Sequence, residues 1–328
     1  VQKQVNDTTS ATGQLVSRGN SDYSTEAAWA FVTYAANDNI DLRMGRLRIP
    51  FFYYSDFLEV GYAYKWTRPP EEVYRIPFSS IDGADFTYRF SSGSMDGSVQ
   101  LYYGRYNGPF KVDFGQGNGE ETYAADFRNF TGITLNNNFG NFGTRLSYHQ
   151  AELTLDTRDS SSTLGLAING NGTAQAPGVA AIAASLGEPS AADDFSFNGQ
   201  TSQFYGAAAF YDNGDISMIA EWTMLDHGNS VFLDDQGWML SASKRMGDFT
   251  PHLTYSSQVD EYDSGVEGKI QELLPLKVEE SSITLGLRYD YDSSTALKLE
   301  VQNKDQKTLR GQDGESATLY SVSVDVIF

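Results

Sequence analysis

Three histidines and no cysteine leave this chain few residues for nucleophilic or metal chemistry. The spacing of His149, His227 and His252 matches no metal-ligand pattern, and without cysteine there can be no disulfide, thiolate zinc site or thiol nucleophile. Ser147 and His149 would share one face of a strand, but no base with an orienting partner accompanies a nucleophile. We therefore expect no enzyme, no catalytic residue, no metal and no cofactor.

Acidic residues outnumber basic ones by 43 to 23, which gives a formal net charge of −20 at pH 7. A charge of this sign argues against nucleic acid as a partner. Some acid-rich segments could bind calcium, although solvated charge explains them better. These segments are Asp156–Asp159, Asp193-Asp194, Asp234-Asp235 and Asp260–Asp263.

The mean hydropathy of −0.40 is typical of water-soluble proteins. The 20 Tyr, 20 Phe and 4 Trp residues are nevertheless too many for a disordered chain. The longest apolar stretch, at 178–184, is far shorter than the roughly 18 residues that a membrane-spanning helix needs. Helical insertion into a membrane is therefore not expected.

The dominant sequence period is two, which is typical of strands with one apolar and one polar face. Ile283, Leu285 and Leu287, for example, alternate with small or polar residues. Most predicted strands are close to the ten residues that a tilted strand needs to cross a bilayer. Besides a stub at Val1–Val5, strands are expected at 11–18, 25–36, 39–48, 82–91, 96–106, 122–136, 141–155, 199–211, 214–226, 235–246, 248–258, 281–291, 295–304 and 316–328.

The connections between these strands are alternately short and long. Short turns are expected at 6–9, 37–38, 92–94, 137–140, 212–214, 246–247 and 292–294. Longer loops are expected at 19–24, 49–81, 107–121, 156–198, 227–234, 259–280 and 305–315. This alternation indicates an up-and-down antiparallel sheet with its turns at one end and its loops at the other.

A β-sandwich would also have alternating strands, but its turns need not alternate in length, and a chain of this size would usually be split into domains. A barrel with its apolar face in lipid and a polar interior explains the low hydropathy, the aromatic content and the alternating loops together. We therefore predict an all-β fold, a transmembrane antiparallel up-and-down β-barrel that forms a single domain over residues 1–328.

The last strand carries the most specific signal. One of its faces ends on the C-terminal phenylalanine and consists of Tyr320, Val322, Val324, Val326 and Phe328. This pattern resembles the C-terminal assembly signal of Gram-negative outer-membrane barrels. The resemblance implies that Phe328 lies at the periplasmic end and that the long loops are extracellular.

Most of the chain also resembles the trimeric general porins. In that family a Gly-Arg pair closes the strand before a long loop that folds back into the pore, and Gly45-Arg46 matches this pair. The preceding Trp29–Tyr34 and the following Gly83–Arg89 are similar to the flanking strands. The resemblance implies about 16 strands, of which 14 to 15 are visible here, and an inward-folded constriction loop at 49–81. It also implies a homotrimer in the outer membrane, in contact with lipid and lipopolysaccharide.

The N-terminal end departs from this pattern. If 49–81 is the third extracellular loop, eleven strands follow it as expected, but only three strands and the stub precede it. Because unpaired backbone in lipid costs several kcal/mol per group, a closed barrel needs the missing segment. We expect that the sequence begins about one and a half strands late.

The segment 49–81 is too aromatic to be a solvated loop. It contains Phe51, Phe52, Tyr53, Tyr54, Phe57, Tyr62, Tyr64 and Trp66. We expect it to pack against the inner wall and set the size limit of the pore, because long ordered loops usually carry function. The alternative is an apolar surface loop that shields a trimer contact.

Charged residues are expected to line this constriction. The loop supplies Asp56, Glu59, Glu71, Glu72, Arg68 and Arg75, with Lys65, while the wall supplies Arg43 and Arg89 and, more distantly, Arg18, Arg128, Arg145, Arg245 and Arg288. Acids that face a wall of arginines would create a transverse field, although each arginine could instead pair with a nearby acid. Arg46 and Arg48 should point outward unless their strand ends at Gly45.

Together these features predict a porin that passes small hydrophilic solutes and ions by passive diffusion. The sequence leaves the sign of the charge selectivity open. A substrate-specific channel for sugars or anions and a non-conducting structural or receptor barrel are the alternatives.

Overall fold

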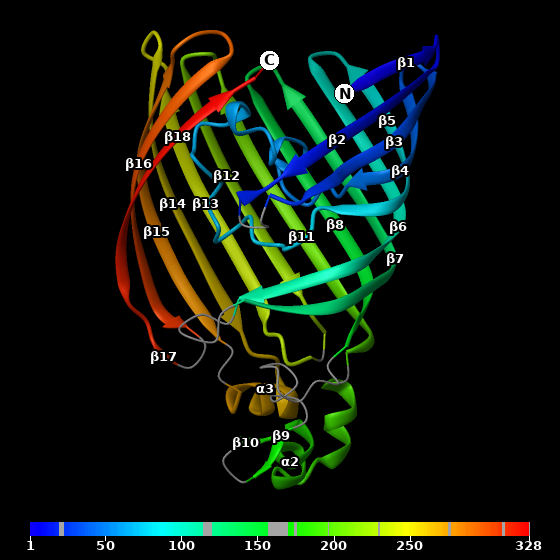
Figure 1. The fold of residues 1–328 in the computed structure, drawn as a ribbon, viewed down its shortest axis with the longest axis vertical. Coiled ribbons are helices and arrows are strands. Elements are labelled where there is room, and N and C mark those ends of the chain that lie inside the picture. The colour runs from blue at the N-terminus through cyan, green and yellow to red at the C-terminus, as the bar shows by residue number, and fades with distance from the viewer. Residues whose placement is uncertain are drawn as a thin grey trace.

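The computed structural model describes residues 1–19, 23–113, 120–156, 170–173, 176–195, 197–228, 230–274, 277–309 and 312–327. Its main feature is one antiparallel sheet of 16 strands, shown in Figure 1. The strands are β1 (Gln2–Asn6), β2 (Thr9–Ser17), β3 (Thr25–Asn37), β4 (Ile40–Arg48), β5 (Ser80–Ser92), β6 (Met95–Asp113), β7 (Glu120–Phe139), β8 (Phe142–Leu155), β11 (Asn198–Asp212), β12 (Ile216–Asp226), β13 (Asp234–Lys244), β14 (Phe249–Glu261), β15 (Val278–Asp290), β16 (Thr295–Leu309), β17 (Gln312–Asp313) and β18 (Ser316–Val326).

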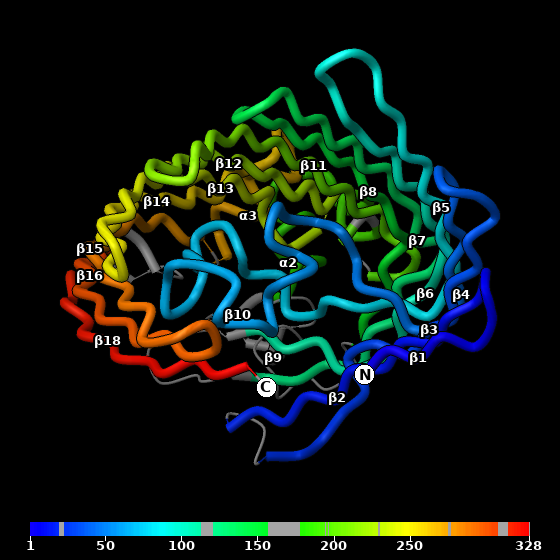
Figure 2. Tube along the Cα trace, turned by 90° about the horizontal axis from the view of Figure 1, so that it is seen from above, coloured from blue at the N-terminus to red at the C-terminus, as the bar shows by residue number. Residues whose placement is uncertain are grey.

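Each strand of this sheet pairs with its neighbours in the chain, with β8 beside β11 and β16 beside both β17 and β18. Seen from above, the sheet curves around a central space (Figure 2). The short connections lie at the end that carries both termini, and the long ones lie at the opposite end (Figure 1). The predicted up-and-down all-β architecture is therefore confirmed. Between the described residues of β1 and β18 there is no pairing.

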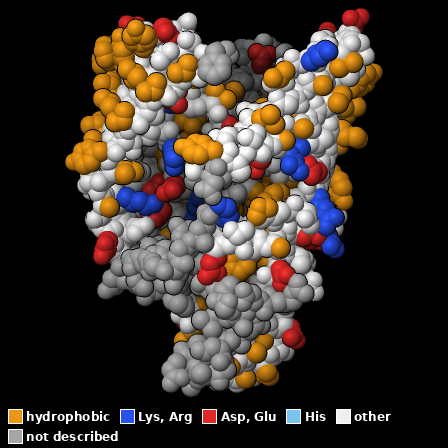
Figure 3. Space-filling view, viewed as in Figure 1, with side chains coloured by type: hydrophobic (Ala, Val, Ile, Leu, Met, Phe, Trp, Pro, Cys, Tyr) orange, Lys and Arg blue, Asp and Glu red, His pale blue; other side chains and the backbone are white. Residues whose placement is uncertain are grey.

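The sheet buries its polar face and exposes its apolar face. In β15, Ser282 and Thr284 are 2% and 6% exposed, whereas Ile283 and Leu285 are 53% and 61% exposed. Hydrophobic side chains cover both outer edges of the upper part of the molecule in Figure 3. This pattern is the reverse of a water-soluble protein and is that of a barrel whose outer wall faces lipid.

The predicted loops contain more regular structure than expected. Most of the predicted loop at 107–121 belongs to the long hairpin of β6 and β7. The loop end carries the helices α2 (Val179–Ser185), α3 (Gly265–Glu272) and η4 (Pro189–Phe195) and a small sheet of β9 (Gly170–Thr173) and β10 (Ala176–Pro177). No helix of the described part of the chain is long and apolar enough to span a membrane.

Candidate functional site

Residues 49–79, here called the inner loop, connect β4 to β5 and lie inside the ring of strands (Figure 2). The inner loop contains two short helices, η2 (Ser55–Phe57) and η3 (Gly61–Ala63). Its hydrogen bonds reach β8, β12 and β14 to β16, which are far from its own two strands in the sheet. The inner loop therefore crosses the interior of the barrel.

The two arms of the inner loop meet at Glu221, a buried residue of β12. Its carboxylate accepts hydrogen bonds from the Tyr53 backbone N–H, at 2.7 Å, and from the Tyr74 hydroxyl. The rings of Phe52 and Tyr74 also pack together, with their centroids 4.7 Å apart. We call this junction the clasp, because it closes residues 55–72 into a separate lobe.

Two cations hold the end of this lobe through backbone carbonyl groups. The Arg288 guanidinium donates to the carbonyls of Tyr62 and Tyr64 at 2.6 and 3.0 Å. The Lys298 ammonium, which is fully buried, donates to the carbonyls of Gly61 and Trp66 at 2.6 and 2.7 Å. Charged donors make stronger hydrogen bonds than neutral ones, so these contacts fix the lobe against β15 and β16.

Neutral and acidic wall residues complete the attachment. The Trp66 indole N–H donates to the Thr254 hydroxyl at 2.8 Å, and the Thr67 backbone N–H donates to Glu300 at 3.0 Å. At the start of the inner loop, Arg145 donates to the Pro50 carbonyl at 2.5 Å. The inner loop is thus bound to the wall along most of its length.

The wall arginines predicted at the constriction are paired with wall acids. Arg43 forms an ion pair with the buried Asp85. Arg89 forms an ion pair with Asp41. The backbone N–H of Arg89 donates to the Asn39 carbonyl, which places Arg89 close to the turn at 38–39. Among the described contacts, neither arginine is hydrogen-bonded to the inner loop.

The loop acids meet other basic residues instead. Glu59 accepts a hydrogen bond from Arg18 at 2.5 Å and lies 3.8 Å from Arg48. Glu71 is exposed and lies 3.3 Å from the Lys304 ammonium of β16. Glu59 of the inner loop therefore lies against two basic side chains, Arg18 and Arg48.

The remaining predicted loop charges have different surroundings. Asp56 and Arg68 are exposed. Glu72 is buried and accepts a hydrogen bond from the Ser256 hydroxyl at 2.9 Å. Arg75 forms ion pairs with Asp235 and Asp260 on β13 and β14.

Two predicted orientations are wrong. Arg128 was expected to point inward, but a bulge between Arg128 and Thr131, with Asn129 at φ 50°, shifts the alternation of β7. Arg128 is exposed as a result, and pairs with Asp126 on the outer face. Arg48 was expected to point outward, but its side chain is 4% exposed and its guanidinium lies 5.2 Å from the Trp29 ring.

Arg46 points outward, as the predicted alternation of the strand requires, and its side chain pairs with Asp82. Strand β4 continues past Gly45, where the backbone has φ 136°. A Cβ atom at position 45 would lie 2.3 Å from the Ala30 carbonyl oxygen. Of the more distant arginines, Arg145 and Arg288 bind the inner loop, and Arg245 is exposed near a short turn.

The predicted C-terminal pattern lies on β18. Its residues Tyr320, Val322, Val324 and Val326 are exposed, and Phe328 lies outside the described residues.

Glu221, Lys298 and Glu300 bind the inner loop but are not among the predicted site residues. All three are charged residues in the middle of a strand on its polar face. That placement is the signal that distinguishes them, because a charge in mid-strand needs a partner from elsewhere in the chain. The described residues contain no group of three or more side chains arranged to hold a metal ion.

Comparisons with known proteins support a porin-type fold. No family model and no curated protein matches the sequence. Among solved structures, the outer-membrane channel DcaP of Acinetobacter baumannii matches with a TM-score of 0.59 and 10% identity over 98% of this chain and 81% of that chain. OmpF of Salmonella typhi matches with a TM-score of 0.57 and 14% identity over 99% and 88%. An anion-selective porin from Comamonas acidovorans matches with a TM-score of 0.55 and 13% identity over 100% and 87%.

These structural matches cover nearly the whole chain at low identity, so they establish the fold and not the solute. The chain has the transmembrane β-barrel fold of outer-membrane porins.

Proposed function

We propose that this protein is an outer-membrane porin through which small hydrophilic solutes and ions diffuse passively. The observation that carries the proposal is the barrel with an apolar outer face and a polar inner face, crossed by an ordered inner loop. Such a barrel places water-compatible groups along its axis and hydrocarbon-compatible groups around it. Nothing in this arrangement requires catalysis, so we propose a channel and not an enzyme.

In this proposal the inner loop is the constriction, within a single barrel domain. The lobe 55–72 occupies part of the cross-section, and its anchors keep it in one position. The exposed loop charges Asp56, Glu71 and Arg68, together with the Glu59 contacts to Arg18 and Arg48, would set the field that a passing ion meets.

The experiment that tests the proposal is single-channel recording in planar bilayers. Discrete current steps that grow with salt concentration are expected. Saturable block by one sugar or anion would favour a substrate-specific channel, and the absence of any current from a correctly folded barrel would favour a structural or receptor barrel.

We also propose that the barrel forms a homotrimer in contact with lipid and lipopolysaccharide. A set of charged pairs on the outer face of β4 to β7 supports this, since isolated charges facing hydrocarbon are unfavourable. The pairs are Arg46 with Asp82, Arg105 with Asp126 and Arg128 with Asp126. Chemical cross-linking in native membranes should trap three copies.

Leu285→Arg is expected to destabilise the barrel in lipid vesicles by about 2–4 kcal/mol, since Leu285 is 61% exposed on the outer face. The matched control is Gln302→Arg on the inner face of the adjacent strand, opposite Thr284. Urea titration of vesicle-refolded protein measures both. Equal losses in the two variants would contradict a lipid-facing outer wall.

The charge of Lys65 is expected to make ion selectivity depend on pH. Burial in the inner loop lowers the pKa of the Lys65 ammonium to about 8. The group is therefore charged below that pH and neutral above it. As the pH rises through about 8, the interior loses a positive charge and the reversal potential should move toward cation preference. Lys65→Met should remove this step, and an unchanged profile would exclude Lys65 as its source.

A further inference from the structure

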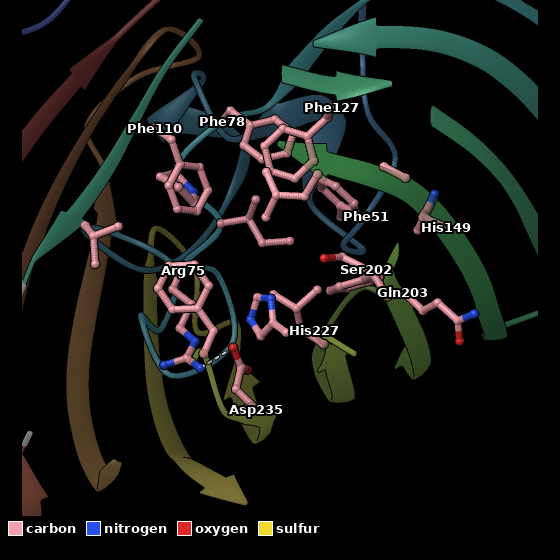
Figure 4. A pocket seen from close by; sticks show the side chains of 18 of the residues that line it. Phe51, Arg75, Phe78, Phe110, Phe127, His149, Ser202, Gln203, His227 and Asp235 are labelled. Carbon is pink, nitrogen blue, oxygen red and sulfur yellow. Dashed lines mark ion pairs between the residues drawn. The ribbon is translucent and has the colours of Figure 1, made fainter. Parts of the chain in front are cut away.

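A cavity of about 310 Å³ lies between residues 75–78 of the inner loop and the barrel wall. Figure 4 shows it from close by. Phe51 and residues 75–78 of the inner loop line one part of it, and side chains from β6, β7, β8 and β11 line another. His227, Phe232 and Leu233, which lie between β12 and β13, and Asp235 of β13 also line it. The volume is at the lower end of the range for small-molecule sites.

Phenylalanine rings form much of the lining, which is unexpected inside a barrel with a polar inner face. The Phe78 ring lies 4.7 Å from Phe127 and 6.4 Å from Phe110, measured between centroids. Phe51 lies 4.9 Å from Phe204. Figure 4 shows Phe78, Phe110 and Phe127 grouped on one side of the cavity. Such a wall favours a planar ring that can stack against it or meet it edge-on.

Three polar side-chain atoms at the cavity are buried and have no hydrogen-bond partner among the described residues: His149 Nε2, Ser202 Oγ and His227 Nδ1. His149 and Ser202 are 1% and 8% exposed. The other ring nitrogen of His149 is hydrogen-bonded to the Tyr102 hydroxyl at 2.7 Å, which fixes the ring. Because a buried polar atom without a partner costs free energy, these three atoms indicate hydrogen bonding to an occupant.

The charged side chains that line the cavity are balanced in number, with Arg75 and Lys111 positive and Asp235 and Asp260 negative. Arg75 forms ion pairs with both aspartates. Burial lowers the pKa of His227 to about 4, so this imidazole is neutral at physiological pH. An occupant therefore meets aromatic surface and neutral hydrogen-bonding groups, without an uncompensated charge to attract an ion.

We propose that this cavity binds an uncharged hydroxyaromatic solute, with its ring against the phenylalanines and its hydroxyl groups on His149, Ser202 and His227. The proposal rests on the proposed channel function, and it assigns to that channel a solute class recognised beside the inner loop.

Isothermal titration calorimetry of the detergent-solubilised barrel tests this proposal, with 4-hydroxybenzyl alcohol as the probe and xylitol as a non-aromatic polyol of similar size. Saturable binding of the aromatic probe and none of xylitol is expected. Phe78→Ala should raise the dissociation constant about fivefold to tenfold through the loss of ring contact. Ser202→Ala should raise it about threefold to tenfold by removing one hydrogen bond without altering the fold.

The matched control is Phe57→Ala, since Phe57 is an exposed aromatic of the inner loop outside the cavity lining. This variant should bind like the unmodified protein. No binding of the aromatic probe, equal binding of xylitol, or an equal effect of Phe57→Ala and Phe78→Ala would overturn the proposal. Absent binding with intact ion currents would overturn the cavity assignment alone. Binding without any current would instead overturn the channel function.

Discussion

Lys298→Met is expected to detach the end of the inner loop and to lower the free energy of unfolding by about 3 kcal/mol. The Lys298 ammonium is held by the carbonyls of Gly61 and Trp66 and by the Asp325 carboxylate, 2.9 Å away. Methionine fills a similar volume but leaves all three acceptors without their donor. We expect a loss of unfolding free energy at the low end of the range for broken buried ion pairs, because the Asp325 side chain is 19% exposed and can be partly hydrated.

Limited trypsin digestion measures the detachment directly. Lys65 precedes Trp66 and is 9% exposed, so the bond after it is protected while the lobe is docked, and Arg68 is followed by a proline. Lys298→Met should become susceptible to cleavage after Lys65. Lys307→Met is the matched control, since it removes an exposed lysine of the same strand that pairs with Glu279. Cleavage at the same rate in both variants would show that Lys298 does not hold the lobe.

The strands could be predicted because the environment on their two faces differs so strongly. A one-residue error in β15 would turn Ile283 and Leu285 inward and Ser282 and Thr284 outward, so the alternation has to be regular. The predicted strands and the alternation of turns and loops are accordingly found in the structure. The interior segment 49–81 was recognisable by its aromatic content, which no solvated loop would carry.

The contacts of the inner loop could not be predicted in the same way. Glu221 and Tyr53 are 168 positions apart, and nothing in the local pattern of either residue indicates the other. The predicted side-chain directions were also wrong at the bulge near Asn129. The bulge adds one residue to β7, so the side chains on its N-terminal side, including Arg128, point opposite to the predicted direction. Helix α2 depends on the burial of Val179, Ile182 and Ala183, a helical spacing too short to stand out within a long polar loop.

Removing the lobe 55–72 is expected to raise the single-channel conductance several-fold and to admit larger solutes. The clasp makes this excision structurally conservative, because Tyr53 and Tyr74 bind the same Glu221 carboxylate and a short Gly-Ser linker can join the two arms. The lobe's former partners, Arg288 and Lys298 among them, would then face the aqueous interior and could be hydrated. Planar-bilayer recording with polyethylene glycols of increasing size measures both effects.

The excision also changes the charge of the interior, so its effect must be separated from that of volume. The lobe carries four acidic and two basic residues, and its loss therefore removes two negative charges. Asp56→Asn combined with Glu71→Gln makes the same change at two exposed positions and leaves the lobe in place. If the lobe limits the pore by occupying space, only the excision should raise the conductance and the size limit, whereas both variants should shift the reversal potential in the same direction. The narrowest segment of a pore contributes most of its electrical resistance. If the excised variant had the same conductance as the unmodified protein, the narrowest point of the pore would therefore lie elsewhere.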